Sequence, residues 1–310
     1  MNTTASVRAD TPLVLANGIV LKNRLAKAAM SEQLADGRHD PAAGLERLYR
    51  TWAAGNIGLL ISGNIMIDRD HLGEAKNIVL DEDSSLAAFQ RWTLAGREHG
   101  THFWAQLNHP GKQTPKMLTR EPLAPSAIAL GRGLERAFNT PRAMNEADIA
   151  DVICKFARSA LLAREAGFTG VQIHGAHGYL VSQFLSPRHN QRSDRWGGSF
   201  ENRMRFVLEV YRAIRVAVGA DFPVAIKLNS ADFQKGGFSE EESMLVVEAL
   251  AREGIDLVEI SGGTYESPAM VGRRPRSLPP RPRHPPRQPR SVKPISSPTR
   301  KRCAYGWRRR

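Results

Sequence analysis

Residues 171–180 read VQIHGAHGYL, and this stretch carries most of the information about how the chain folds and works. A short apolar run at 171–173 is followed at once by a glycine-rich turn that holds His174, His177 and Tyr179. Proteins of the α/β class place chemistry at such points, because a strand fixes the base of the loop that follows it. Taken alone, the cluster also fits a hydrogen-bonded loop or a pair of metal ligands. The stretch therefore predicts a strand that ends in a functional turn.

The positive charge of the chain is concentrated at one end. The formal net charge is +13, and residues 271–310 contain fourteen Lys and Arg but no Asp or Glu. Subtracting these fourteen from +13 leaves −1 for residues 1–270. Overall basicity would by itself suggest a nucleic-acid-binding protein. Here it belongs to the tail, and the remainder has the charge of an ordinary near-neutral domain.

Other features restrict the class of protein. Residues 1–10 are polar and lack the apolar segment of a signal peptide. No stretch approaches the roughly 18 apolar residues that a membrane helix needs. The two cysteines, Cys154 and Cys303, do not have the spacing of a metal cluster, so we expect no metal site. We expect a cytoplasmic protein that does not enter the membrane.

The order of the apolar runs predicts an α/β fold. Asn17-Gly18 lies between two short apolar runs and predicts a hairpin. Strands are expected at residues 25–30, 58–62, 102–107, 170–174, 223–228 and 256–260, and helices at 41–55, 86–100, 149–167, 200–218 and from a capping box at 239–242 to about 254. Residues 109–143 are expected to form a long loop. Strands that alternate with helices indicate a parallel sheet covered by helices.

Polar side chains recur at or near the ends of these strands. They are Ser31, Asn64, Gln106, His174 and Asn229. No glycine-rich dinucleotide-binding turn follows the first strand. Polar residues spread over many strand ends fit a barrel whose site is ringed by loops better than an open sheet with one crevice.

Several motifs together resemble one family. They are residues 22–25 (KNRL), 28–31 (AAMS), 106–111 (QLNHPG), 124–128 (APSAI), 165–168 (EAGF), 174–180 (HGAHGYL), 183–187 (QFLSP) and 197–203 (GGSFENR). In this order they resemble the old yellow enzyme family of FMN-dependent NAD(P)H:flavin oxidoreductases, over roughly residues 10–270. The resemblance implies an α/β TIM (β/α)8 barrel with FMN across its C-terminal mouth. Residues 192–198 are similar to a family loop that we interpret as structural.

The resemblance also implies which residues bind FMN. The backbone of Ala28, Ala29, Met30 and Ser31 should border the flavin, with the Ser31 hydroxyl near the carbonyl beside N5, where a donor tunes the potential. Asn64 should lie near the ring system, and Gln106 offers a donor and an acceptor to the pyrimidine edge. Without the resemblance, loop hydrogen bonding would explain Ser31, Asn64 and Gln106.

Lys227 matches a position at which the family places a cation near flavin N1 and O2. A cation there stabilises the negative charge of reduced flavin. A solvated surface lysine is the alternative, but the apolar residues around Lys227 favour a buried position.

The same resemblance implies catalytic roles for residues in the stretch 171–180. His174 and His177 are similar to a pair that hydrogen-bonds the substrate carbonyl, and Tyr179 to the donor of a proton to the α-carbon. NADH or NADPH would reduce FMN and leave, and reduced N5 would then pass hydride to an electron-poor alkene or another small oxidant.

The family pattern breaks near residue 270. Six strands are found where the family has eight, and the last two would bind the FMN phosphate. Residues 271–310 instead contain nine prolines and fourteen basic residues, a composition typical of disorder. We therefore expect a partial barrel at 1–270 and a disordered tail at 271–310, through a shifted reading frame or an aberrant terminus, with impaired FMN retention. The alternative is an inactive barrel fragment whose basic tail binds nucleic acid or other polyanions.

Overall fold

A parallel sheet forms the centre of the fold in the computed structural model, which describes residues 8–131 and 133–267. Its strands lie in the order β11 (Leu257–Ser261), β10 (Val224–Asn229), β9 (Gly170–Gly175), β6 (His102–Asn108), β4 (Leu59–Met66) and β3 (Ala26–Lys27), and β5 (Ile78–Val79) pairs with β4. All of these pairings are parallel. The six strands expected from the sequence are therefore confirmed, although the first spans only two residues.

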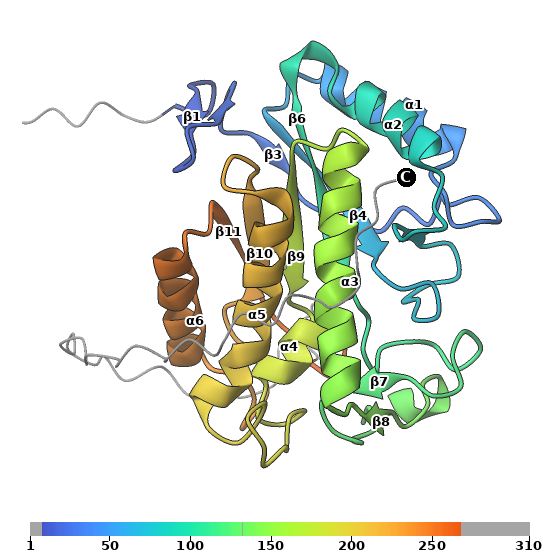
Figure 1. The fold of residues 1–310 in the computed structure, drawn as a ribbon, viewed down its shortest axis with the longest axis vertical. Coiled ribbons are helices and arrows are strands. Elements are labelled where there is room, and N and C mark those ends of the chain that lie inside the picture. Colours follow the sequence, from blue (N-terminus) through green and yellow to red (C-terminus); the bar gives the residue numbers. More distant parts are fainter. Residues whose placement is uncertain (1–7, 132, 268–310) are drawn as a thin grey trace, which may run out of the picture.

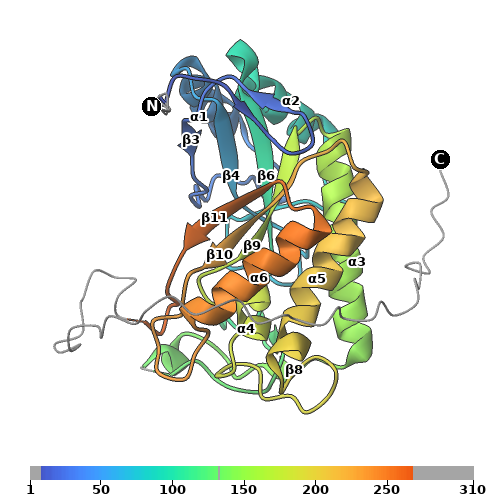
Figure 2. The same ribbon diagram turned by 90° about the vertical axis from the view of Figure 1, so that its left-hand side faces the viewer.

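Amphipathic helices cover the outer face of this sheet. They are α1 (Ala43–Ala54), α2 (Leu86–Gly96), α3 (Glu146–Glu165), α5 (Phe200–Val218) and α6 (Glu240–Glu253). Ser239 and Glu242 cap α6 reciprocally, as the sequence predicted. Figure 1 and Figure 2 show α3, α5 and α6 side by side along the strands. Their apolar stripes form one large core with the outward-facing residues of the sheet.

The predicted hairpin closes the inner side of the sheet at the end where the strands begin. Strands β1 (Leu13–Val14) and β2 (Val20–Leu21) pair in antiparallel fashion around Asn17-Gly18. Leu15 and Leu21 pack against the inward-facing residues Ile61 and Trp104. The hairpin therefore fills one end of the barrel interior and leaves the other end, where the loops follow the strands, for a site.

The barrel is incomplete within the described residues. β3 and β11 are the two ends of the sheet, and no described strand joins them. The side chain of Ile260 in β11 is 61% exposed, which is unusual for the strand of a barrel. The curled parallel sheet with helices outside confirms the expected fold class of an incomplete TIM barrel.

Three details differ from the sequence prediction. The expected loop at 109–143 contains strands β7 (Leu123–Ala124) and β8 (Arg142–Ala143) and a 3-10 turn, Leu134–Arg136. A short helix that the pattern did not show, α4 (Leu180–Leu185), follows the opening turn. Helix α2 ends at Gly96, and Glu98–Gly100 form a separate 3-10 turn because His99 adopts a left-handed conformation. The expectations for residues 271–310, both disorder and polyanion binding, lie outside the described residues.

No helix among the described residues is both long enough and apolar enough to cross a bilayer.

Candidate active site

Side chains from neighbouring strands converge inside the curved sheet, near the ends of the strands. The register pairs Asn64 with Gln106 across β4 and β6, and it pairs Lys227 with both His174 and Glu259. Paired residues share a face of the sheet. The register shifts between Ile61 and Asn64, and this irregularity brings both side chains to the inner face although three positions separate them.

Nine of the ten predicted site residues line one open pocket at this end of the barrel. They are Ala29, Met30, Ser31, Asn64, Gln106, His174, His177, Tyr179 and Lys227. The tenth, Ala28, is exposed and is not among these lining residues, so its expected place beside a ligand stays a prediction. Residues far apart in the sequence meet here because each follows or ends a strand of the same sheet.

Hydrogen bonds from two neighbouring segments hold the turn after β9. His177 and Gly178 both adopt left-handed backbone conformations, with φ of 61° and 78°. The His177 N–H donates to Asn229 Oδ1 at 3.1 Å, and its carbonyl accepts from Gln113 Nε2 at 3.2 Å. A non-glycine residue with positive φ stores strain that the surroundings must offset, and such residues gather at functional sites. The turn therefore presents its three side chains in a fixed arrangement.

Both histidines of the turn are neutral near pH 7. Burial first, and then the neighbouring His177 and Lys227, hold the pKa of His174 well below its ordinary value. Burial and Lys227 lower the pKa of His177 to about 4. The Ala176 N–H donates to His174 Nδ1 at 3.4 Å, so Nε2 carries the proton of the neutral ring. His174 therefore acts as a neutral hydrogen-bond donor, and His177 Nε2 is 2.6 Å from the hydroxyl of Ser261.

Tyr179 has a hydroxyl partner that the sequence prediction missed. Its hydroxyl oxygen lies 2.8 Å from that of Tyr265, which comes from the loop after β11 and is 40% exposed. The Tyr179 ring makes an edge contact with the His174 ring, with centroids 4.8 Å apart. Burial, followed by the charge of Tyr265, raises the pKa of Tyr179 well above its ordinary value. Tyr179 is therefore protonated at neutral pH and close to His174.

Lys227 also has a partner that the prediction missed. Its Nζ is 2.9 Å from Glu259 Oε1, and the lysine side chain is only 7% exposed. Glu259 Oε2 accepts from Gln172 Nε2 at 2.8 Å, and Gln172 Oε1 accepts from Gln106 Nε2 at 2.7 Å. The sequence does contain a signal for Glu259. It is the one charged residue in the run Leu257–Ser261, which forms the strand next to that of Lys227, and its charge is opposite to that of the lysine. A continuous polar chain therefore crosses the floor of the pocket.

Ser31 is engaged at the opposite rim. Its hydroxyl donates to the carboxylate of Glu74, which also accepts from Gln33 and Asn77. The family resemblance implied a Ser31 hydroxyl that donates beside flavin N5, and this role stays a prediction. In the structure the Ser31 hydroxyl donates to Glu74, so its oxygen remains available as an acceptor.

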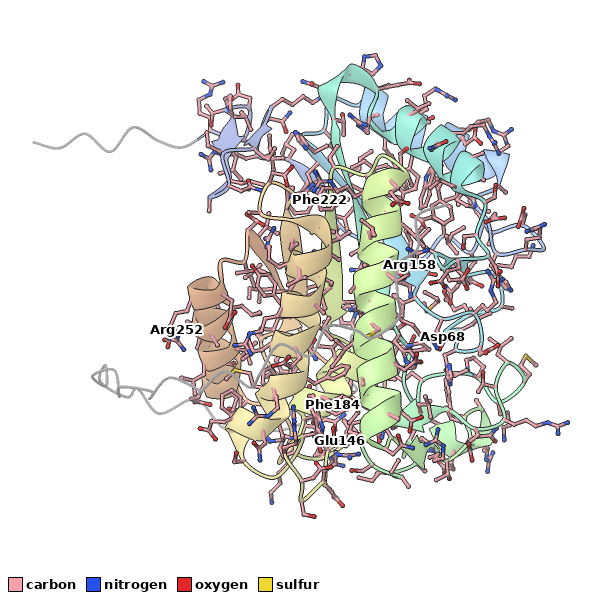
Figure 3. All side chains as sticks on the ribbon, in the orientation of Figure 1. Asp68, Glu146, Arg158, Phe184, Phe222 and Arg252 are labelled. Carbon is pink, nitrogen blue, oxygen red and sulfur yellow. The ribbon has the colours of Figure 1, made fainter. Side chains whose placement is uncertain are left out.

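Asp68, His71 and His109 form a second polar cluster, and none of them lines the pocket. Their potential ligand atoms lie within 4.8 Å of one another. Figure 3 shows Asp68 beside α3, whose Lys155 donates to it at 2.8 Å. The Gly111 N–H donates to His109 Nδ1 at 3.0 Å, which places the ring proton on Nε2, the atom that a metal would need. A metal would have to displace this Nε2 proton, and Nε2 has no hydrogen-bond partner among the described residues.

Comparison with known proteins identifies the family. The family model described as "NADH:flavin oxidoreductase / NADH oxidase family" matches residues 11–280. The chain belongs to this family. The NADH-dependent flavin oxidoreductase iliE of Hypocrea jecorina (strain QM6a) is 38% identical over 286 residues, covering 86% of this chain and 70% of that protein. The NADH oxidase of Thermoanaerobacter brockii is 36% identical over 258 residues, covering 80% of this chain and 38% of that protein.

Solved structures of family members share the fold. A 2-naphthoyl-CoA reductase in complex with 2-naphthoyl-CoA superposes with a TM-score of 0.79 at 28% identity, covering 84% of this chain and 41% of that one. The old yellow enzyme homologue from Zymomonas mobilis gives 0.74 at 27% identity, covering 82% and 73%. The chain spans between 29% and 70% of the length of these and other curated relatives that it matches. The resemblance stated from sequence motifs is therefore confirmed.

The family uses FMN with NADH or NADPH, and the pocket floor suits the ring system of FMN. Gln106 and Lys227 are both buried polar side chains that face the pocket, and they offer an acceptor oxygen and a cation. An isoalloxazine ring presents an imide N–H between two carbonyls, which complements these groups. The described part of the chain therefore contains residues whose chemistry fits the ring side of FMN.

Proposed function

We propose that this chain is an FMN-dependent NAD(P)H oxidoreductase of the ene-reductase type, acting on small electron-poor alkenes in the cytoplasm. The observation that carries the proposal is the meeting of His174, His177 and Tyr179 with Gln106 and Lys227 in one pocket. When bound, FMN would supply the hydride chemistry that connects NADH or NADPH with the alkene. Gln106, Lys227, Asn64 and the 29–31 segment are the residues that we propose to hold it.

His174 and His177 would bind and polarise the acceptor. A neutral imidazole N–H that donates to a carbonyl oxygen withdraws electron density from the conjugated double bond and stabilises negative charge as it develops there. Burial keeps His174 neutral, so it binds the carbonyl without delivering a proton to it. The fixed turn sets the direction of this hydrogen bond before the substrate arrives.

Tyr179 would supply the proton. Its raised pKa makes it a weak acid that stays protonated until a carbanion-like carbon forms nearby. Its ring lies against His174, so a carbonyl bound by that histidine would bring the adjacent carbon close to the Tyr179 hydroxyl. Proton transfer from Tyr179 would then complete reduction of the double bond.

We further propose that the described residues hold FMN through its ring, because the pocket residues described above face the position proposed for that ring. Riboflavin, which has the same ring without the phosphate, should therefore compete with FMN for this pocket. Failure of riboflavin to compete would contradict this part of the proposal.

One experiment tests the activity itself. The protein is saturated with FMN, reduced anaerobically with NADH and mixed with 2-cyclohexen-1-one. We expect cyclohexanone to form in amounts equal to the NADH consumed. Cyclohexene, which lacks the carbonyl that His174 and His177 would bind, is the control and should not react. Reduction of neither alkene, with FMN bound, would overturn the ene-reductase assignment.

A further inference from the structure

Hydrogen-bond chemistry fixes the orientation of each side-chain amide in the polar chain across the floor of the pocket. A carboxylate only accepts hydrogen bonds, so Gln172 must direct its amide NH2 toward Glu259, as its 2.8 Å contact shows. The carbonyl of Gln172 then faces Gln106, which must direct its own NH2 toward Gln172 at 2.7 Å. Gln106 is left with its carbonyl oxygen for the pocket that it lines. The charge of Glu259 therefore determines which atom Gln106 presents.

The same carboxylate sets the net charge beside the pocket. Glu259 Oε1 lies 2.9 Å from Lys227 Nζ, and their side chains are 24% and 7% exposed. The two residues pair directly in the register of β10 and β11. In a poorly solvated interior, an adjacent carboxylate cancels much of the field that a lysine exerts on a neighbouring ligand. Lys227 is thus a hydrogen-bond donor whose positive charge is largely compensated.

We propose that Glu259 is a positioning residue that lowers the affinity of this site for reduced flavin relative to oxidised flavin. It does so by compensating Lys227, and through Gln172 it fixes Gln106 as an acceptor toward the imide edge of the ring. The inference rests on the proposed flavin-binding function. It assigns a role to a residue that does not itself line the pocket and that acts through Lys227 and Gln172.

The test compares the binding of oxidised and reduced FMN in solution. Anaerobic titrations give the dissociation constant of each form for the wild-type protein, Glu259→Gln, Gln172→Leu and Glu253→Gln. Glu253 is a matched control, because its carboxylate pairs with Arg212 on the outer helices. The same isosteric change there removes a carboxylate from an ion pair without altering the polar chain.

We expect Glu259→Gln to favour reduced FMN about tenfold relative to oxidised FMN, which for a two-electron couple is about 30 mV in midpoint potential. Gln172→Leu should weaken both forms similarly, because it frees the Gln106 amide but keeps the Lys227–Glu259 pair. Glu253→Gln should change neither ratio nor affinity. An unchanged ratio in Glu259→Gln, in a protein that binds FMN, would overturn this inference alone. If the wild-type protein binds neither form, the proposed function fails and this inference fails with it.

Discussion

The turn after β9 and the floor formed by β10 and β11 use buried polar groups in opposite ways. In the turn, burial and the nearby Lys227 keep His174 and His177 uncharged, and backbone contacts fix their direction. On the floor, Lys227 and Glu259 form an ion pair across adjacent strands, and their orientation comes from side chains. The difference fits the proposed function, in which the turn binds a neutral carbonyl compound and the floor binds a ligand whose charge changes.

Substitution of Tyr179 should have the largest effect of all. It should slow alkene reduction, which depends on the turn, without a comparable effect on FMN binding, which depends on the floor. Tyr179→Phe removes the proposed proton donor, and we expect alkene reduction to fall by about 10²–10⁴-fold, the usual contribution of general acid catalysis. FMN binding and reduction by NADH should stay within about twofold of wild type, since the floor is intact. Stopped-flow measurement of the two half-reactions checks this. Equal losses in both would show that Tyr179 instead maintains the pocket.

His174→Ala should also slow only the reaction that depends on the turn, which is reoxidation by the alkene. Loss of one preorganised donor costs about 10²–10³-fold in comparable sites. The rate of reoxidation with 2-cyclohexen-1-one should fall accordingly, while reoxidation by molecular oxygen, which needs no carbonyl contact, should not change. Comparing the two acceptors in the same preparation provides the control. A parallel fall with oxygen would remove His174 from substrate binding.

Lys227→Met tests whether the floor of the pocket binds FMN. Removal of one charge-assisted contact of about 1.5–3 kcal/mol should weaken FMN binding by about tenfold or more. Since Glu259 then has no cation beside it, the binding of reduced FMN should be weakened more than the binding of oxidised FMN. Fluorescence titration measures both effects. Unchanged binding would exclude Lys227 from the flavin site.

The neutral histidines predict a pH dependence of stability. The folded-state pKa of His177 is about 4 and that of the buried His109 is about 3, both lowered first by burial, against about 6.5 in the unfolded chain. The unfolded state therefore binds more protons below pH 6.5. The free energy of unfolding should fall as pH drops from 6.5 toward 4, by up to about 1.4 kcal/mol per pH unit for each such histidine. Urea unfolding at several pH values measures this slope, which His177→Asn should make shallower.

The smallest effect expected concerns Gly178. An alanine there must adopt φ of 78° and would place its Cβ 2.8 Å from Gln113 Oε1. Gly18→Ala is a matched control, because its φ is 85° and its Cβ would meet nothing within 4 Å. The left-handed conformation costs about 1–2 kcal/mol in both variants. Gly178→Ala should be the less stable of the two in urea unfolding, by the added cost of moving Gln113. Equal losses would mean that Gln113 does not brace the turn.

Much of the fold was predictable because its signals are local. Apolar runs and capping residues gave the six strands, the main helices and the hairpin around Asn17-Gly18. The candidate site residues followed from the family resemblance of motifs that lie at or near strand ends, and nine of the ten expected positions line the pocket. Ala28 is not among the residues that line the pocket, and its expected backbone contact with the flavin stays a prediction.

The partners of the site were not predictable, because they depend on register and on loops. Glu259 meets Lys227 through the pairing of β10 with β11, and Glu74 reaches Ser31 from a loop 43 positions away. Tyr265 meets Tyr179 only once the loop after β11 folds back over the turn. Each of these contacts alters the chemistry expected of its predicted neighbour.

Binding of the flavin ring in the pocket at the end of β4, β6, β9 and β10 can be measured by titrating the purified protein with FMN and following flavin absorbance and fluorescence. We expect saturable binding of one FMN per chain, with a shifted absorbance band and quenched fluorescence, and competition by riboflavin. Absence of saturable binding, or binding that Lys227→Met leaves unchanged, would show that this pocket is not a flavin site.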